Sequence, residues 1–190
     1  MLDQMFLLNS ILGTGILLLE IFLVSIILIF IFNKNLLKDL FEKNKKYLTE
    51  KNLLIVIFLF SLISSILTLV YSEYFGQVPC ALCWFQRVFT YGIVVLSGTA
   101  LSPFSTGEGL GMRLALKNIF VFSIFGSIFA LYQHLEQILA LYGTHLPCPV
   151  SGADCAKMTI FEYSHITFPW MAFVLFLFFI VAIFLQKKYK

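Results

Sequence analysis

The chain has 190 residues, of which 60% are apolar and only 12% are charged, and its formal net charge is +3. Soluble domains are roughly half apolar and a quarter charged, so this composition excludes an ordinary soluble protein and favours a protein embedded in a bilayer. The chain also lacks the ten-residue alternation that is typical of outer-membrane barrels. We expect no nucleic-acid partner.

Five apolar runs are long enough to cross the hydrocarbon of a bilayer, which is about 30 Å thick. They are residues 11–32, 53–72, 84–101, 115–134 and 167–185. The first run has Asp3 but no basic residue before it, and it exceeds the apolar core of a signal peptide, so we expect it to be a retained helix. The longest polar stretch, 135–166, is too short for a soluble core. These features predict an all-α integral membrane protein.

Lysines indicate the orientation. Loop 33–52 contains six of them, and the positive-inside rule places such a loop in the cytoplasm. Alternation then puts the N-terminus outside and the C-terminal tail inside, with 11 of the 13 lysines and arginines on the cytoplasmic side. The two exceptions are Arg87 and Lys157.

The four cysteines form two pairs. Cys80 and Cys83 border the third apolar run, and Cys148 and Cys155 follow about 65 residues later in a polar segment. Two predicted spans separate the pairs, so both face the extracytoplasmic side, where disulfides form and persist. Two dithiols on one side of a membrane suggest an electron relay.

The surroundings of the first pair favour a thiolate. Pro79 ends any preceding helix and Trp84 opens the next apolar run, so Cys83 is expected in the first helical turn, where the helix dipole favours an anion. Arg87 lies one turn deeper on the same face. Its partners would be the Cys83 thiolate and a carbonyl ligand that gains negative charge on reduction, which in a bilayer indicates a quinone; Gln86 adds a hydrogen-bond donor. The alternative is an Arg87 side chain that reaches to the interface without a redox role.

Two other uses of the cysteines stay open. A zinc site is disfavoured because six residues separate Cys148 from Cys155, where two to four are usual. A purely structural disulfide is possible in that turn-rich loop, but a disulfide closed over two residues is more often catalytic, which disfavours structural roles for both pairs. No βαβ pattern surrounds Cys80 and Cys83, so the chain is not itself a thioredoxin.

The remaining ionisable groups at membrane depth have simpler interpretations. Glu20 lies near the middle of the first apolar run, and we expect it to be bonded to a neighbouring helix. His134, His145 and His165 fall at or near the outer side, and each is expected to be a solvated or interfacial histidine.

The first pair and the residues after it resemble the signature of the disulfide bond formation protein B family, DsbB, and of its shorter relatives called BdbC. The motif reads Cys80-Ala81-Leu82-Cys83-Trp84-Phe85-Gln86-Arg87. Cys148 and Cys155, with residues 166–170 leading into the last span, resemble the second half of that family. The likeness covers residues 52–186.

This resemblance implies a four-helix transmembrane bundle of DsbB type in residues 52–190. Residues 1–51 then form an additional N-terminal transmembrane helix and a basic cytoplasmic loop. The short spacing of Cys148 and Cys155 is closer to the BdbC branch, because DsbB proper has a longer loop. Vitamin K epoxide reductase relatives carry the two pairs in the reverse order, which disfavours that family.

The activity implied by the resemblance is that of a thiol:quinone oxidoreductase in the bacterial cytoplasmic membrane. It would reoxidise a soluble thioredoxin-like donor of DsbA or BdbD type and pass the electrons to ubiquinone or menaquinone, supporting protein disulfide formation. The partner would attack Cys148, Cys155 would exchange with Cys80, and Cys83 would face the quinone beside Arg87 and Gln86. The alternative is a non-enzymatic membrane anchor or assembly protein whose outer loops hold structural disulfides or a metal.

Overall fold

The computed structural model describes residues 2–44, 46, 48–102, 109–148 and 154–189. Its regular elements are all helical. They are α1 (Leu2–Phe32), α2 (Lys34–Lys43), α3 (Glu50–Leu69), the π-helical turn η1 (Val70–Tyr74), α4 (Ala81–Leu101), α5 (Leu110–Ala140) and α6 (Phe168–Tyr189). Five of these stretches, with η1 continuing α3, are long and apolar enough to span a membrane. This confirms the predicted all-α membrane architecture.

The helices run beyond the apolar runs from which they were predicted. The fourth run ends at residue 134, but α5 continues to Ala140 because polar side chains of its last turns find partners in other segments. His134 Nδ1 lies 2.9 Å from Thr167 Oγ1, and Gln137 donates to the Lys157 carbonyl at 3.1 Å. An apolar run measures only the part of a helix that faces hydrocarbon, so it underestimates such a helix.

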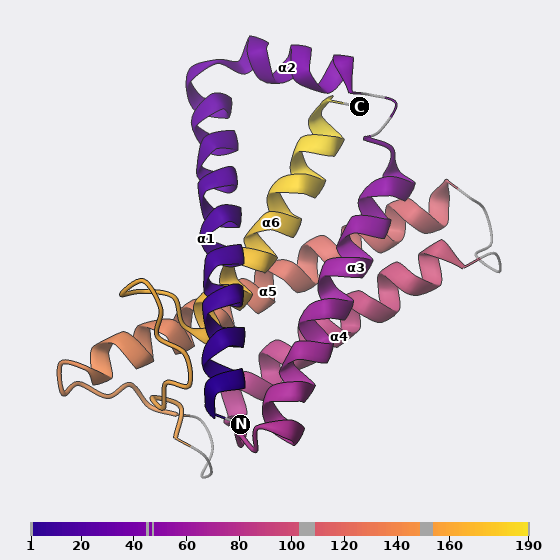
Figure 1. The fold of residues 1–190 in the computed structure, drawn as a ribbon. Helices are drawn as coiled ribbons and strands as arrows, with labels where there is room; N and C mark the ends of the chain where they lie inside the picture. Colours follow the sequence, from indigo (N-terminus) through magenta and orange to yellow (C-terminus); the bar gives the residue numbers. More distant parts are fainter. Residues whose placement is uncertain (1, 45, 47, 103–108, 149–153, 190) are drawn as a thin grey trace.

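Helices α3, α4, α5 and α6 form a four-helix bundle with α1 beside it (Figure 1). Within the bundle α5 packs most extensively against α6 and α4. Gly126 permits the close approach of α5 and α6, because a methyl group at this position would lie 2.6 Å from the Phe176 ring. The buried core takes apolar side chains from all four helices, among them Leu54, Ile57, Ile93, Ile119 and Phe176.

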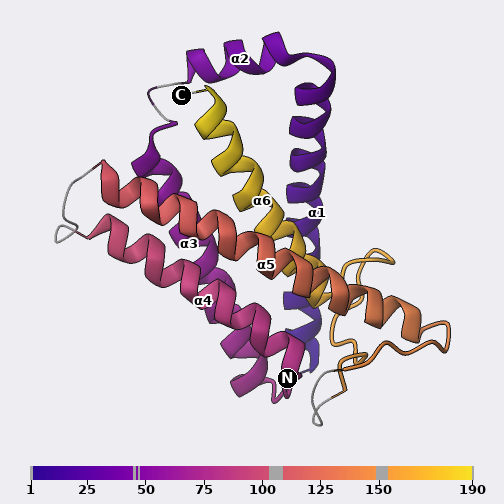
Figure 2. The same ribbon diagram turned by 180° about the vertical axis from the view of Figure 1, so that it is seen from behind.

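Helix α1 packs mainly against α6 and α2, and most of its apolar side chains are exposed. An apolar helix surface that the protein does not cover is suited to contact with lipid. Figure 2, seen from behind, shows α1 along α6, separated from most of α4.

Helix α2 corrects the sequence-based description of residues 33–52 as a loop. Asn33 caps this ten-residue helix by accepting the Leu36 N–H, and Leu37 is buried. The Phe41 and Tyr189 rings lie 5.1 Å apart, which fixes α2 near the end of α6 (Figure 1). This helix was not predicted for two reasons. The segment was interpreted from its lysines and not from the amphipathic spacing of its leucines, and a helix of ten residues is too short to be identified as a membrane span.

The two cysteine pairs lie at the same end of the bundle. The start of α1, the segment before α4 and the segment between α5 and α6 are found at this end, whereas α2 and the C-terminal end of α6 lie at the opposite end (Figure 1). An even number of spans between the pairs has this consequence in any helical bundle.

Candidate active site

The first cysteine pair lies at the N-terminus of α4. Cys80 is the N-cap residue, with an extended backbone, and its sulfur accepts the Cys83 N–H at 3.3 Å. Cys83 is in the first helical turn, as predicted. Both cysteines are thiols, and their sulfur atoms lie 2.8 Å apart. Cys80 is buried and Cys83 is partly exposed.

The two thiols differ in protonation. The hydrogen bond to the Cys83 sulfur, and then burial, raise the pKa of the Cys80 thiol above its ordinary value. A raised pKa favours the protonated form of Cys80 in this reduced state, and its sulfur lies within hydrogen-bond distance of the Cys83 sulfur. Negative charge on the pair is thus directed to Cys83, at the position that the helix N-terminus stabilises.

The second pair is a disulfide between Cys148 and Cys155. Tyr132 of α5 donates to the Pro147 carbonyl at 2.8 Å, which anchors the chain just before Cys148. The Asp154 carboxylate accepts the Ala156 N–H at 2.9 Å and turns the chain just before Cys155. Cys155 is 0% exposed, whereas Cys148 remains partly exposed.

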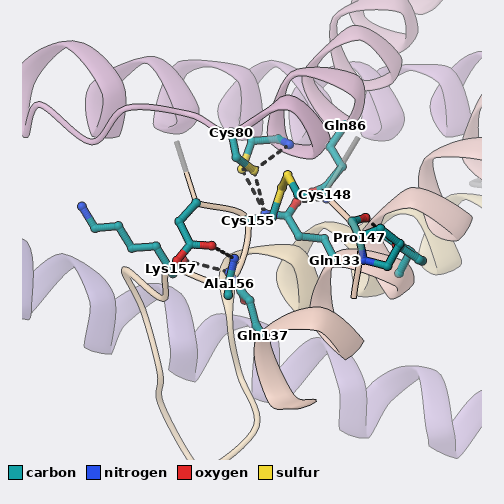
Figure 3. The surroundings of a disulfide bond; sticks show 12 residues. Cys80, Gln86, Gln133, Gln137, Pro147, Cys148, Cys155, Ala156 and Lys157 are labelled. Atoms are coloured by element: carbon teal, nitrogen blue, oxygen red, sulfur yellow. Dashed lines mark hydrogen bonds between the residues drawn. A yellow bond between two sulfur atoms is a disulfide. The ribbon is translucent and has the colours of Figure 1, made fainter. Parts of the chain in front are cut away.

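The fold packs the two pairs together. Cys155, Cys80 and Leu82 belong to one buried cluster, with Cys148 and Cys83 at its margin. Figure 3 shows Cys80 beside the Cys148–Cys155 disulfide. The cysteines come from the N-terminus of α4 and from the segment between α5 and α6. Thiol–disulfide exchange requires contact between sulfur atoms, and this shared cluster places the two pairs beside each other.

Gln133 of α5 is a site residue that the sequence analysis missed. Its amide nitrogen donates to both Cys80 and Cys83, with N···S distances of 3.1 Å each. Its carbonyl oxygen accepts from Gln86 at 2.7 Å, so the predicted Gln86 reaches the sulfur atoms only through Gln133. A glutamine at the end of an apolar run is itself a signal, because polar groups at membrane depth are frequently functional.

Replacing Gln133 with Leu is expected to slow alkylation of the first pair at pH 7 by about tenfold, because a hydrogen bond to a charged group contributes about 1.5–3 kcal/mol. The measurement is the rate of modification of reduced protein by a maleimide. Gln137→Leu is the matched control, since Gln137 lies one turn further along α5 and donates to the Lys157 carbonyl instead. Equal rates in the wild type and the Gln133 variant would contradict this role.

Arg87 is 8% exposed, which argues against a side chain that merely reaches for the interface. Its guanidinium donates to the Thr68 carbonyl at 2.8 Å and to the Ser72 hydroxyl at 3.4 Å, and it lies over the Trp84 ring at 5.2 Å. The hydrogen bonds of Arg87 thus go to α3 and η1. The sequence analysis had expected the Cys83 thiolate as its partner. Among the described residues no carboxylate pairs with Arg87. Its charge is therefore available to a ligand.

A cavity of about 670 Å³ opens beside the thiols. Cys80, Cys83, Gln86, Arg87 and Gln133 line it at the end where the cysteines lie. Apolar side chains of α1, α3 and α6 form most of its remaining wall. One end can therefore bind a polar group beside Cys83, and the rest suits an apolar chain.

Glu20 bonds to His165 and Trp170 between α1 and the start of α6. The Glu20 carboxylate accepts from the Trp170 indole N–H and lies 3.2 Å from His165 Nε2. The expected bond from Glu20 to a neighbouring helix is confirmed. His134 is buried and His145 is exposed. Glu20 and these histidines do not line the cavity at Cys83.

Comparison with known proteins decides the family. The family model for disulfide bond formation protein DsbB matches residues 50–186. This chain belongs to the DsbB family. The resemblance stated for the cysteine motif is thereby confirmed, and the four matched helices are the DsbB-type bundle, with α1 and α2 preceding it. DsbB membership and the five apolar helices make this a multi-pass membrane protein with a disulfide oxidoreductase activity.

Curated relatives support the DsbB assignment. Disulfide bond formation protein C of Bacillus subtilis (strain 168) is 30% identical over 130 residues, covering 68% of this chain and 88% of that protein. A probable disulfide formation protein of Metapseudomonas resinovorans is 34% identical over 138 residues, covering 70% and 87%. The SPbeta prophage-derived disulfide bond formation protein B of Bacillus subtilis (strain 168) is 30% identical over 136 residues, covering 70% and 82%. No solved structure matches the chain significantly. The relatives named protein C agree with the expected likeness to the BdbC branch.

Proposed function

We propose that this protein is a membrane thiol:quinone oxidoreductase that reoxidises a thioredoxin-like disulfide donor and thereby supports protein disulfide formation. One observation carries the proposal. A disulfide, Cys148–Cys155, packs against a dithiol, Cys80 and Cys83, and that dithiol lines a cavity together with a buried arginine. A structural disulfide alone would not need a second pair in contact with it.

Exposure supports Cys148 as the entry point for electrons. A partner thiolate attacks the partly exposed Cys148, the bond to Cys155 breaks, and Cys155 leaves as a thiolate. The second thiol of the partner then closes the partner's own disulfide and leaves Cys148 and Cys155 reduced. The buried Cys155 is unsuited to attack from solution. The partner is a soluble thioredoxin-like protein of DsbA or BdbD type.

The internal exchange runs between Cys155 and Cys80, which share a buried cluster. Cys155 attacks Cys80 of the oxidised first pair, and Cys83 leaves as a thiolate stabilised by the Gln133 N–H and the α4 N-terminus. Cys148 then closes the second disulfide again, so that two electrons and two protons have moved to Cys80 and Cys83. The arrangement found here, with a dithiol beside a disulfide, corresponds to this stage.

The residues around the cavity fit a quinone as the final acceptor. Arg87 has no carboxylate partner among the described residues, so it and Gln86 would hold a carbonyl oxygen at the polar end, while the apolar wall would hold the rest of the molecule. A bound quinone, ubiquinone or menaquinone, supplies the acceptor for the two electrons and two protons released when Cys80 and Cys83 form their disulfide. Strongly oxidising disulfide donors have reduction potentials of about −120 mV, so a quinone-class acceptor is needed to drive their reoxidation.

The charge distribution supports an orientation in the bacterial cytoplasmic membrane. We infer that the cysteine end is extracytoplasmic, because α2 and the C-terminal end of α6 carry lysines at the opposite end. The N-terminus is then outside and the C-terminus inside. Residues 52–190 form the redox unit, and residues 1–51 add a helix and a basic cytoplasmic segment.

The test is anaerobic oxidation, by one equivalent of quinone, of purified protein in which Cys80 and Cys83 are reduced and the Cys148–Cys155 disulfide is intact, the state found here. We expect one equivalent of quinol, measured by absorbance, and loss of alkylation at Cys80 and Cys83, measured by mass spectrometry. If quinone leaves both thiols open to alkylation, the protein is not a quinone-linked oxidase. A membrane anchor with structural disulfides would give that second result.

A further inference from the structure

The cavity beside Cys83 has a wall that the DsbB match does not cover. Ile11, Gly15, Leu18 and Phe22 line it from α1, which precedes the matched residues 50–186. They recur at three- and four-residue spacing, so they share one face of the helix. At 1.5 Å per residue, that face extends roughly 16 Å along the helix axis.

The wall on the other side of the cavity comes from α3, which lies alongside α1 with the opposite chain direction. Phe60, Ile63, Ser64 and Leu67 line the cavity there, and Thr68 follows beside Arg87. Because the two helices are antiparallel, Ile11 on α1 and Thr68 on α3 lie toward the cysteine end, while Phe22 and Phe60 lie toward the middle of the bundle. The groove therefore leads from the thiols into the apolar depth of the membrane.

Polar bonds hold α1 in place beside this groove. The Glu20 carboxylate accepts from the Trp170 indole of α6, and Asn9 accepts from the Tyr71 hydroxyl of η1 at 2.5 Å. The Thr14 and Tyr163 hydroxyls lie 3.0 Å apart. These bonds attach α1 to α6, η1 and the 154–167 segment, while the cavity separates the lining face of α1 from α3.

We propose that α1 completes a binding groove for the isoprenoid tail of the quinone. The inference rests on the proposed function and extends it to a ligand subsite formed by the added helix. A single cavity joins the polar end at Cys83 and Arg87 to the apolar groove, so its occupant has a redox-active polar head and an apolar tail in one molecule. An isoprenoid quinone has both parts. A four-helix bundle without α1 would leave this face of the tail open to lipid.

Gly15→Leu tests the groove directly. Gly15 lines the cavity and nothing lies within 4 Å of a β-carbon built there, so this position has room for a side chain. We expect the KM for a quinone with a long isoprenoid tail to rise about tenfold, which corresponds to about 1.4 kcal/mol. We also expect about tenfold less isoprenoid quinone in solvent extracts of the purified protein. The KM for a tail-less benzoquinone should not change.

Two further variants keep the test independent of folding. Val24→Phe adds bulk on α1 at an exposed position that does not line the cavity, and it should match the wild type. Phe22→Ala removes part of the wall without adding bulk, and it should also weaken only the long-tailed quinone. Equal effects of the Gly15 substitution on both quinones, or no effect on either, would overturn the inference. Loss of co-extracted phospholipid with unchanged quinone would show a lipid in the groove and also overturn it.

The wild type separates this inference from the proposed function. If the unmodified protein retains no quinone and is oxidised by neither compound, the proposed function fails and the tail groove with it. If it is oxidised by both but the α1 variants do not distinguish them, only the role of α1 is wrong.

Discussion

Cys83→Ala is expected to reduce quinone reduction to the uncatalysed rate, while partner capture at Cys148 persists. The substitution removes one of the two sulfur atoms that must form the Cys80–Cys83 disulfide, so no two-electron step remains at the cavity. The Cys148–Cys155 disulfide has its own anchors in Tyr132 and Asp154 and stays available to a thiolate. Quinol formation is followed by absorbance, and partner capture by the mixed disulfide on non-reducing gels.

Cys155→Ala is the informative control for this variant. It leaves the first pair intact, so chemically reduced protein should still reduce quinone at the wild-type rate. Its Cys148 is then a single thiol, so a reduced partner should form no mixed disulfide with it, because the Cys148–Cys155 bond that the partner thiolate would break is missing. Undiminished quinone reduction in the Cys83 variant would refute the assignment, and trapping only through Cys155 would reverse the proposed order of attack.

Arg87→Gln is expected to slow quinone reduction about a hundredfold, because loss of one preorganised donor to a developing negative charge costs roughly 10²–10³ in rate. Arg87 is buried beside the cavity and has no carboxylate partner among the described residues. Arg87→Lys should be intermediate, since lysine keeps the charge but loses the planar fork that reaches Thr68 and Ser72. The measurement is the single-turnover rate with pre-reduced protein.

Arg113→Gln provides a matched charge removal. Arg113 is exposed, pairs with Glu50 at 3.3 Å and lies in the first turn of α5, at the end opposite the cysteines. Its substitution should leave the rate unchanged, because Arg113 does not line the cavity at Cys83. Thermal unfolding of both variants separates a loss of the α3–α4 link from a loss of charge at the cavity. Equal rates in the two variants would contradict a role for Arg87 in the electron transfer.

Several features of this protein follow from local sequence patterns. The five spans appear as apolar runs because the thickness of the bilayer sets a minimum length for a helix that crosses it. The position of Cys83 in the first turn of α4 follows from Pro79 and the start of the next run, and the structure agrees. The common side of the two cysteine pairs follows from the number of spans between them.

Other features depend on contacts between segments that are far apart in the sequence, so local sequence patterns do not predict them. Residues 34–43 form a helix because Leu37 and Phe41 find surfaces on the end of the bundle. Arg87 donates to Thr68 because α3 passes beside α4, although spacing within α4 favoured Cys83. Gln133 reaches both sulfur atoms only because α5 packs against α4.

The cavity shows the physical reason for this division. Helix pitch and bilayer thickness constrain residues that are close in the sequence. The spacing of apolar residues and the length of apolar runs therefore reveal the membrane-spanning helices. A ligand-sized space is what remains when side chains of α1, α3, α4 and α6 have packed, and no single segment encodes its shape. The cysteines therefore identified the chemistry of the chain, whereas the partners of Arg87 and Gln133 and the position of α1 along the cavity depended on how the helices pack.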